Sequence, residues 1–237
     1  EMTLAEIARL LDEMAELGVL YLNLTGGEIF THPDFFRIYE HARRRGFLVM
    51  LYTNGTRFTP AVIRRLQESP PFSIDVSCHS VHEAAYDGFT GVPGAFRQFL
   101  QGMQLLRESG LPVGFRTKAM TWNREELPDI RRFVESFGRP FRCTTGLSPR
   151  LNGDLSPLAY RLPPDDVAAL EAGWRTEAGA PSEGGGDAGP PGDRLYRCGC
   201  ATTDIHVSAW GDLGTCTMQY EHRQSVRARP VRDAIAT

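Results

Sequence analysis

Three cysteines near the C-terminal end of the chain have the residue type and spacing of metal ligands. Cys198, Cys200 and Cys216 follow a glycine-rich stretch, and the total number of cysteines, five, is odd. Between Cys200 and Cys216 the pattern predicts a β-hairpin that turns at residues 210–212 and brings two thiolates near one another. In a cytosolic chain this favours metal over disulfide, and soft thiolates suit either an iron–sulfur cluster or zinc.

A second group of candidate residues lies near the start of the chain, just after a predicted strand. Gly26 and Gly27 have no side chains, so a ligand could approach the backbone closely and its ammonium group could bond to exposed carbonyls. Glu28 adds a charged acceptor. The same three residues also fit an ordinary turn of two glycines with a solvated glutamate.

The elements that must position these residues alternate between helix and strand from the first residue to about residue 145. This is the signature of βα units around a parallel sheet. Thr3 and Glu6 form a capping box for the first helix, and Thr59 with Pro60 begins another. Strands are predicted at residues 19–24, 47–52, 72–77, 113–118 and 140–144. The predicted fold is α/β, a partial (β/α)6 barrel of the TIM type whose first strand is expected upstream of residue 1.

Four segments carry a resemblance to a known family: residues 24–28 (LTGGE), 52–56 (YTNGT), 74–77 (IDVS) and 90–96 (TGVPGAF). In this order and at this spacing they resemble the radical SAM superfamily. They are most similar to its peptide-modifying maturases, which have a SPASM-type C-terminal domain. The resemblance covers nearly the whole chain, including residues 148–153 and 158–162.

The resemblance implies a cofactor site at the ends of the first three visible strands. Gly26, Gly27 and Glu28 would bind the methionyl amino group of S-adenosylmethionine. Ser77 falls where a serine commonly contacts the ribose of the nucleoside, and Asn54 would face the same cavity. Asn54 equally suits the left-handed position of an Asn-Gly turn, so both roles stay open for it.

Lys118 is the only lysine among 26 basic residues, and it ends a predicted strand on which Arg116 points to the same face. Its ammonium could bind a carboxylate of the cofactor or the substrate, or form a surface salt bridge. Several relatives have an arginine four residues after a histidine in the segment that follows the serine strand. Here Tyr86 stands four residues after His82, which puts one carboxylate contact in question.

Radical SAM chemistry also needs a [4Fe-4S] cluster held by a CxxxCxxC loop, and the sequence contains no such motif. The chain is therefore expected to be a fragment without this loop, inactive on its own. The spacing from Cys198 to Cys216 fits the opening of a SPASM or twitch domain, so the resemblance makes these two the ligands of an auxiliary iron–sulfur cluster. Cys200 is expected to be a bystander, while Cys78 and Cys143 have the setting of small buried hydrophobic residues.

Three parts of the chain are predicted: a radical SAM partial barrel (residues 1–162), a helix and flexible linker (163–193) and the first part of a SPASM domain (194–237). The resemblance implies an enzyme that forms a 5′-deoxyadenosyl radical, abstracts hydrogen and modifies a peptide or protein substrate. It also implies an electron donor such as flavodoxin or ferredoxin. Two alternatives stay open: a non-catalytic module that binds a peptide or nucleoside, and a zinc-binding regulatory protein.

Composition argues against several other classes. The net charge of −3 and the pI near 6.1 provide no basic surface for nucleic acid or an anionic membrane. No apolar run approaches the roughly 20 residues that a helix needs to cross a bilayer. A cytoplasmic location is expected.

Overall fold

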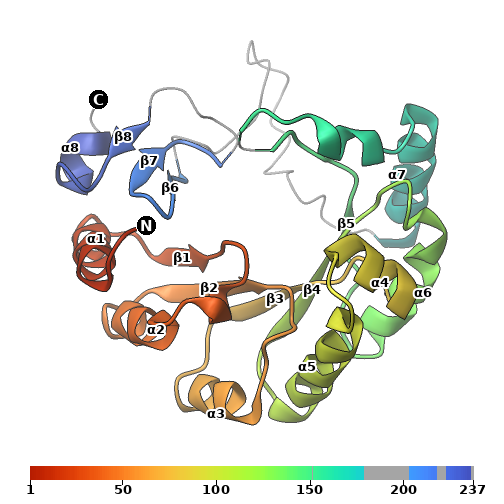
Figure 1. Cartoon of the computed structure of the whole chain (residues 1–237), viewed down its shortest axis with the longest axis horizontal. Coiled ribbons are helices and arrows are strands. Elements are labelled where there is room, and N and C mark those ends of the chain that lie inside the picture. The colour runs from red at the N-terminus through yellow and green to blue at the C-terminus, as the bar shows by residue number, and fades with distance from the viewer. Residues whose placement is uncertain (151, 179–202, 218–222, 236–237) are drawn as a thin grey trace.

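The computed structural model describes residues 1–150, 152–178, 203–217 and 223–235, and its main feature is a five-stranded parallel sheet. Neighbouring strands follow the chain order. They are β1 (Tyr21–Leu24), β2 (Leu48–Thr53), β3 (Ser73–Ser77), β4 (Val113–Lys118) and β5 (Cys143–Thr144). Figure 1 shows the sheet curving around the middle of the molecule. The predicted partial barrel is confirmed, and within the described residues it does not close.

The helices that connect the strands lie outside this curve (Figure 1). They are α1 (Leu4–Glu16), α2 (Phe35–Arg44), α3 (Pro60–Glu68), α4 (Glu83–Thr90), α5 (Ala95–Ser109), α6 (Leu127–Glu135) and α7 (Pro164–Ala178). Short 3-10 helices occupy Ile29–Thr31, Arg124–Glu126 and Ser156–Tyr160. In the described part of the chain, none of the helices is long and apolar enough to span a membrane.

Local sequence signals begin the helices as predicted. The Thr3 hydroxyl accepts a hydrogen bond from the Glu6 N–H, and the Glu6 carboxylate accepts one from the Thr3 N–H, which completes the capping box of α1. Thr59 caps α3, whose first residue is Pro60. These bonds satisfy backbone N–H groups that a helix start leaves without partners.

The two faces of the sheet differ in character. On the convex face, the side chains that point toward the helices are buried and apolar: Val49, Leu51, Ile74, Val76, Val113 and Phe115. On the concave face, the alternate side chains are partly buried or exposed, and most are polar: Met50, Tyr52, Asp75, Ser77, Arg116 and Lys118. Parallel sheets are usually covered on both faces, so an open polar face is a natural place for a ligand.

Helix α5 approaches the turn after β2 very closely at Gly102. A Cβ atom placed on Gly102 would lie 2.1 Å from the carbonyl oxygen of Gly55, a backbone atom that cannot turn aside. Gly55 has a left-handed φ of +81°, and a Cβ there would meet the side chains of Met103 and Phe99. The turn that follows β2 is thus held against α5 by a pair of glycines.

Replacing Gly102 by alanine is expected to destabilise the protein, although alanine favours helix more than glycine does. The methyl group must push α5 away from Gly55, and overpacking of this kind costs about 1–3 kcal/mol. Gly88 in α4 is the matched control, because a Cβ there meets nothing within 4 Å. Gly88→Ala should stabilise the protein by about 0.5–1 kcal/mol. Urea denaturation measures both free energies, and effects of the same sign would contradict the close approach.

The C-terminal residues form a small antiparallel sheet that docks on α1 (Figure 1). Its strands are β6 (His206–Val207), β7 (Asp212–Gly214) and β8 (Gln224–Ser225), followed by α8 (Val231–Ile235). The predicted hairpin is confirmed, with shorter strands and a left-handed Gly211 at its turn. Arg9 on α1 donates to the Val226 carbonyl at 2.6 Å, and Glu13 accepts from the Val231 N–H at 2.6 Å.

Candidate cofactor-binding site

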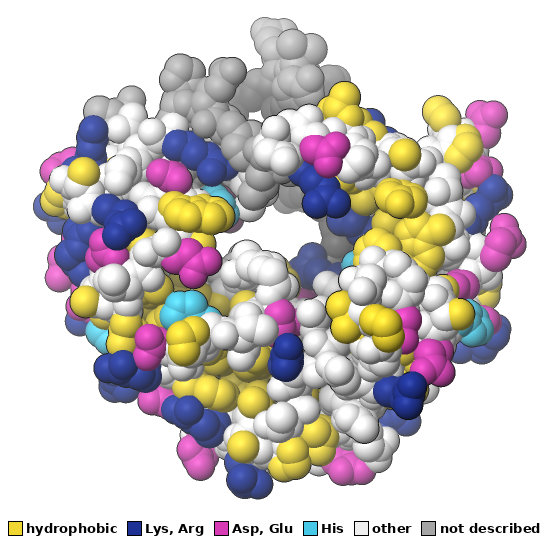
Figure 2. All heavy atoms as spheres, in the orientation of Figure 1, with side chains coloured by type: hydrophobic (Ala, Val, Ile, Leu, Met, Phe, Trp, Pro, Cys, Tyr) yellow, Lys and Arg dark blue, Asp and Glu magenta, His cyan; other side chains and the backbone are white. Residues whose placement is uncertain are grey.

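The carboxyl ends of the strands meet around a hollow in the centre of the molecule, which the space-filling view in Figure 2 shows as an opening. Five of the eight residues predicted to bind a cofactor or metal, Gly26, Gly27, Glu28, Asn54 and Lys118, follow or end strands β1, β2 and β4. A sixth, Ser77, ends β3. The fold therefore brings the predicted cofactor residues to one edge of one sheet.

The backbone of the first loop is uncovered. A Cβ placed on Gly26 or Gly27 meets nothing within 4 Å. Among the described residues, no hydrogen bond outside the strand ladders reaches the carbonyl oxygens of these two glycines. Two carbonyl acceptors are thus open to a donor group such as an ammonium, as the sequence predicts.

The Glu28 carboxylate joins this loop to the end of β2. The Thr53 hydroxyl donates to it at 2.8 Å, and the backbone N–H of Asn54 donates to its Oε2 at 2.8 Å. The Phe30 N–H donates to Oε1 at 3.3 Å. Glu28 therefore braces the glycine loop against β2, a role that the sequence does not reveal because Thr53 and Asn54 are 25 and 26 residues away.

The Asn54 side chain is engaged within its own turn. Its Oδ1 accepts from the Thr56 N–H at 2.9 Å and from the Thr56 hydroxyl at 2.7 Å. The left-handed residue of this turn is Gly55. The side-chain oxygen of Asn54 thus stabilises the turn, and its backbone N–H meets Glu28.

Ser77 and Lys118 end the neighbouring strands β3 and β4. Ser77 is partly buried on the concave face, and among the described residues no hydrogen bond uses its hydroxyl. The Lys118 ammonium donates to the Gly146 carbonyl at 2.8 Å and to the Thr144 hydroxyl at 3.3 Å, both neutral acceptors. In the described part of the chain, no carboxylate lies within 4 Å of it, so the site has an uncompensated positive charge.

Arg116 lies on the same face, as predicted, but it is paired. Its Nε is 3.3 Å from Oδ1 of Asp75, and its guanidinium lies 4.9 Å from the centre of the Tyr52 ring. Of the two basic residues on this strand, Arg116 forms a salt bridge, while among the described residues Lys118 forms none.

Tyr86 occupies the position at which several relatives have arginine. Its side chain is buried, its hydroxyl donates to the Asn54 carbonyl at 3.3 Å, and its ring packs 5.1 Å from that of Phe99. Burial raises its pKa, so it stays neutral. It cannot supply the cation that an arginine would provide.

A clamp that the sequence does not reveal joins the ends of β3 and β4. The buried Asn123 donates to the carbonyls of His79 and Lys118, at 2.8 and 2.9 Å. His79 Nδ1 accepts from the Lys118 N–H at 3.2 Å, so the ring carries its proton on Nε2. Burial, with Lys118 nearby, lowers the pKa of His79 to about 4 and keeps the ring neutral. His79 thus takes part in local hydrogen bonds through its ring and its carbonyl.

The cysteines divide into two groups. Cys78 is buried and Cys143 is partly buried, and burial raises the pKa of each thiol to about 12, as expected for inert packing residues. Cys216 follows β7, while Cys198 and Cys200 lie outside the described residues, as does most of the predicted linker. The described residues contain no group of three or more His, Cys, Asp or Glu side chains that could hold a metal.

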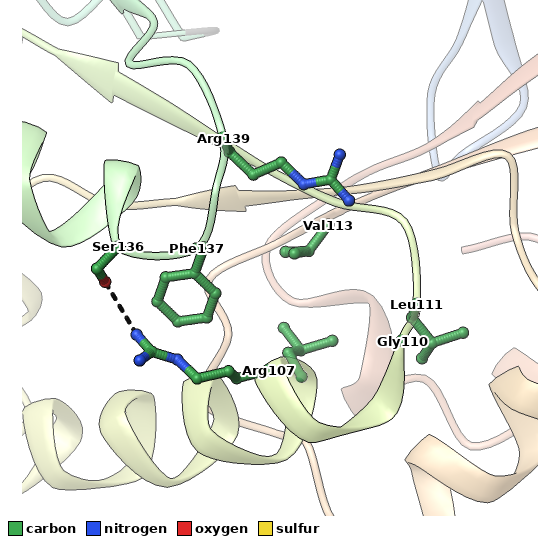
Figure 3. A pocket seen from close by; sticks show the side chains of 8 residues that line it. Arg107, Gly110, Leu111, Val113, Ser136, Phe137 and Arg139 are labelled. Carbon is green, nitrogen blue, oxygen red and sulfur yellow. Dashed lines mark hydrogen bonds between the residues drawn. The ribbon is translucent and has the colours of Figure 1, made fainter.

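A separate pocket of about 210 Å³ lies at the opposite end of the sheet, where α5 ends and β4 begins (Figure 3). Arg107 crosses it, stacking 4.1 Å from the centre of the Phe137 ring and donating to the Ser136 hydroxyl at 2.9 Å. None of the predicted site residues lines this pocket.

The comparison with protein families decides the membership of the chain. A family model described as the radical SAM superfamily matches residues 1–134. The chain belongs to the radical SAM superfamily. Membership implies S-adenosylmethionine and a [4Fe-4S] cluster as cofactors.

Two curated proteins and one solved structure are similar to this radical SAM chain. An AdoMet-dependent heme synthase of Methanosarcina barkeri is 33% identical over 156 residues, which cover 66% of this chain and 45% of that protein. A PqqA peptide cyclase of Granulibacter bethesdensis is 28% identical over 138 residues, covering 58% and 37%. The structure of Streptococcus suis SuiB bound to S-adenosylmethionine has a TM-score of 0.70 at 14% identity, covering 98% of this chain and 58% of that one. The chain spans less than half the length of these two curated relatives.

The residues present fit S-adenosylmethionine at the strand ends. The two open glycine carbonyls suit an ammonium, the Ser77 hydroxyl suits a sugar hydroxyl, and Lys118 suits a carboxylate. For the [4Fe-4S] cluster, the sequence offers no CxxxCxxC motif.

Replacing Glu28 by alanine is expected to lower the free energy of unfolding by about 1–3 kcal/mol, because partly buried donors on Thr53 and Asn54 lose their acceptor. Glu125→Ala is the control, since Glu125 is exposed and surface changes usually stay within about 0.5 kcal/mol. Urea denaturation provides the measurement. A Glu28→Ala variant as stable as the control would show that the brace contributes nothing.

Proposed function

We propose that this chain is the S-adenosylmethionine-binding part of a radical SAM enzyme that modifies a peptide or protein. The observation that carries the proposal is a grouping at one edge of the sheet: two open glycine carbonyls, the Ser77 hydroxyl and the Lys118 ammonium. Among the described residues, this hydroxyl has no hydrogen bond and this ammonium has no carboxylate partner. The carbonyls suit the ammonium group of a methionyl moiety, the lysine suits its carboxylate, and the serine hydroxyl suits a ribose hydroxyl.

Each residue has a distinct task in this proposal. The carbonyls of Gly26 and Gly27 accept from the methionyl ammonium, and Glu28 holds their loop against β2. Ser77 bonds to the ribose, and Lys118 pairs with the methionyl carboxylate. A [4Fe-4S] cluster would supply the electron for reductive cleavage of S-adenosylmethionine, and the radical chemistry on the substrate would follow from it, while the residues of this chain would hold the cofactor. Because the chain lacks CxxxCxxC, it is proposed to bind the cofactor without cleaving it.

The rest of the proposal concerns the organisation of the chain. Residues 1–162 form the partial barrel, 163–193 a connecting helix and linker, and 194–237 the first part of an auxiliary iron–sulfur domain with Cys198 and Cys216 as ligands. The docking of the C-terminal hairpin on α1 supports a compact arrangement of the first and last parts. A flavodoxin or ferredoxin as electron donor and a cytoplasmic location are consistent with thiolate-bound clusters, which need a reducing compartment.

A peptide substrate is supported by the likeness to a peptide cyclase. A tetrapyrrole is a second candidate substrate, because a heme synthase is 33% identical to the chain. Both classes use the same cofactor site in this proposal, so the experiment on that site does not depend on the choice.

Isothermal titration calorimetry of the chain with S-adenosylmethionine tests the proposal. Lys118→Ala is expected to weaken binding about 10- to 100-fold, because a hydrogen-bonded charge contributes roughly 1.5–3 kcal/mol. Arg37→Ala is the control, since Arg37 pairs with Asp34 on the surface of α2. Decarboxylated S-adenosylmethionine should bind the wild type and Lys118→Ala equally. Absence of binding to the wild-type chain would refute the cofactor site, and equal loss for both ligands would refute the role of Lys118.

A further inference from the structure

Large apolar side chains lie exposed on the segments that follow strands β3 and β4. Phe89 in α4 is 49% exposed, and Val92 in the next loop is 51% exposed. Helix α4 and the segment with Trp122 come after the carboxyl ends of these strands, where the predicted cofactor residues also lie. Figure 2 shows hydrophobic side chains on the right-hand rim of the opening, close to the place of α4 in Figure 1. Exposed apolar groups that gather beside a site are typical of a binding surface.

Three rings form one cluster at this rim. Phe89 stacks on Trp122, with ring centres 4.7 Å apart and planes 26° from parallel. The His79 ring meets Phe89 at 5.8 Å, with planes 84° apart. The indole N–H of Trp122 is inaccessible and has no hydrogen-bond partner among the described residues, so this ring contributes apolar surface only. The cluster is thus a small apolar wall in which Phe89 and Trp122 each cover one face of the other.

His79 connects this wall to the proposed cofactor site. Its Nδ1 accepts from the Lys118 N–H at 3.2 Å, which leaves its proton on Nε2, and Asn123 holds its carbonyl at 2.8 Å. Among the described residues, no hydrogen bond uses Nε2, and this nitrogen is not one of the buried atoms without a partner. It is therefore open to solvent. The cluster presents one N–H donor, fixed in direction, beside an apolar wall.

The loop that presents the apolar side chains is braced. The Asp87 carboxylate accepts from the Gly94 N–H at 2.6 Å and from the Phe96 N–H at 2.8 Å, so it ties α4 to the start of α5. Phe89 and Val92 lie between these points. Groups that are held in place before binding lose less conformational entropy when a ligand arrives.

We propose that His79, Phe89 and Trp122 form the part of the substrate site that binds a large apolar or aromatic side chain of the peptide, with the His79 Nε2–H donating to a peptide carbonyl next to that side chain. This inference rests on the proposed function, which assigns a peptide substrate to this edge of the sheet. A carbonyl beside an apolar side chain is what one donor and one apolar wall recognise together. A tetrapyrrole would need a broad open ring face, and the stacking of Phe89 on Trp122 covers one face of each.

The test is a nuclear magnetic resonance titration of the whole chain, labelled with 15N-tryptophan, with N-acetyl-L-phenylalanine methylamide. The indole signal of Trp122, assigned by its loss in Trp122→Phe, reports binding. This probe should bind about tenfold more tightly than N-acetyl-L-alanine methylamide, because its phenyl group buries more apolar surface. Phe89→Ala should remove the preference. Leu100→Ala is the matched control, since Leu100 is a large exposed apolar residue on α5 and should leave the preference unchanged.

A second pair of variants tests the donor. His79→Leu should weaken binding of the phenylalanine probe about fivefold to tenfold, because the donor to the carbonyl is lost. His79→Gln should restore binding, since the glutamine oxygen can accept from the Lys118 N–H while its NH2 group donates to the probe. Equal weakening in both variants would overturn the role of the Nε2–H.

The outcomes separate this inference from the function on which it rests. Equal binding of the two probes to the wild type, or an unchanged preference in Phe89→Ala, would overturn the substrate site. Loss of S-adenosylmethionine binding in Phe89→Ala, with probe binding unchanged, would assign the rings to the cofactor and overturn it as well. Absence of S-adenosylmethionine binding to the wild type in the calorimetry would overturn the proposed function and this inference together. The wild-type preference decides even if Phe89→Ala does not fold.

Discussion

The polar pairing between Arg116 and Asp75 on the concave face of the sheet is the constraint around which the rest of the site is arranged. A parallel sheet normally buries both faces under apolar side chains. Here the register sets Tyr52 beside Asp75, and the Arg116 guanidinium bridges them. Because the charges of Arg116 and Asp75 satisfy one another, the middle of this face stays polar, and a hydrated ligand can approach the strand ends above it.

Two kinds of contact then fix the strand ends relative to one another. The Glu28 carboxylate ties the loop after β1 to the end of β2, and Asn123 ties the end of β3 to the end of β4. The Gly102–Gly55 contact presses the turn after β2 against α5. Each contact acts on backbone groups, so the positions of the strand ends and of the loops that follow them are set by the fold.

The sequence predicts the parts of this arrangement that depend on local signals. The capping residues, the strand order and the glycine pair at the first strand end are encoded within a few residues and are found as expected. Helix α4 is not predicted, because Gly88 lies in its middle, its N-cap residue forms no capping bond and only Tyr86 is buried. Glu28 bonds to Thr53 and Asn54, which are 25 and 26 residues away, and Asn123 bonds to the carbonyl of His79, which is 44 residues away. The periodicity of the sequence does not show such long-range pairs.

The hydrogen-bond partners at the strand ends bear on why Lys118 is a lysine while the other 25 basic residues are arginines. The Glu28 carboxylate is surrounded by hydroxyl and backbone donors. Lys118, the only lysine of the sequence, meets only neutral acceptors among the described residues. A compact ammonium can hold a carbonyl and a hydroxyl and still have a third proton for an incoming carboxylate. The N–H groups of an arginine guanidinium all lie in one plane, so they do not point in three separate directions as those of an ammonium do. In the proposed cofactor site, a lysine at this position makes three donations, to the Gly146 carbonyl, to the Thr144 hydroxyl and to the carboxylate of the cofactor.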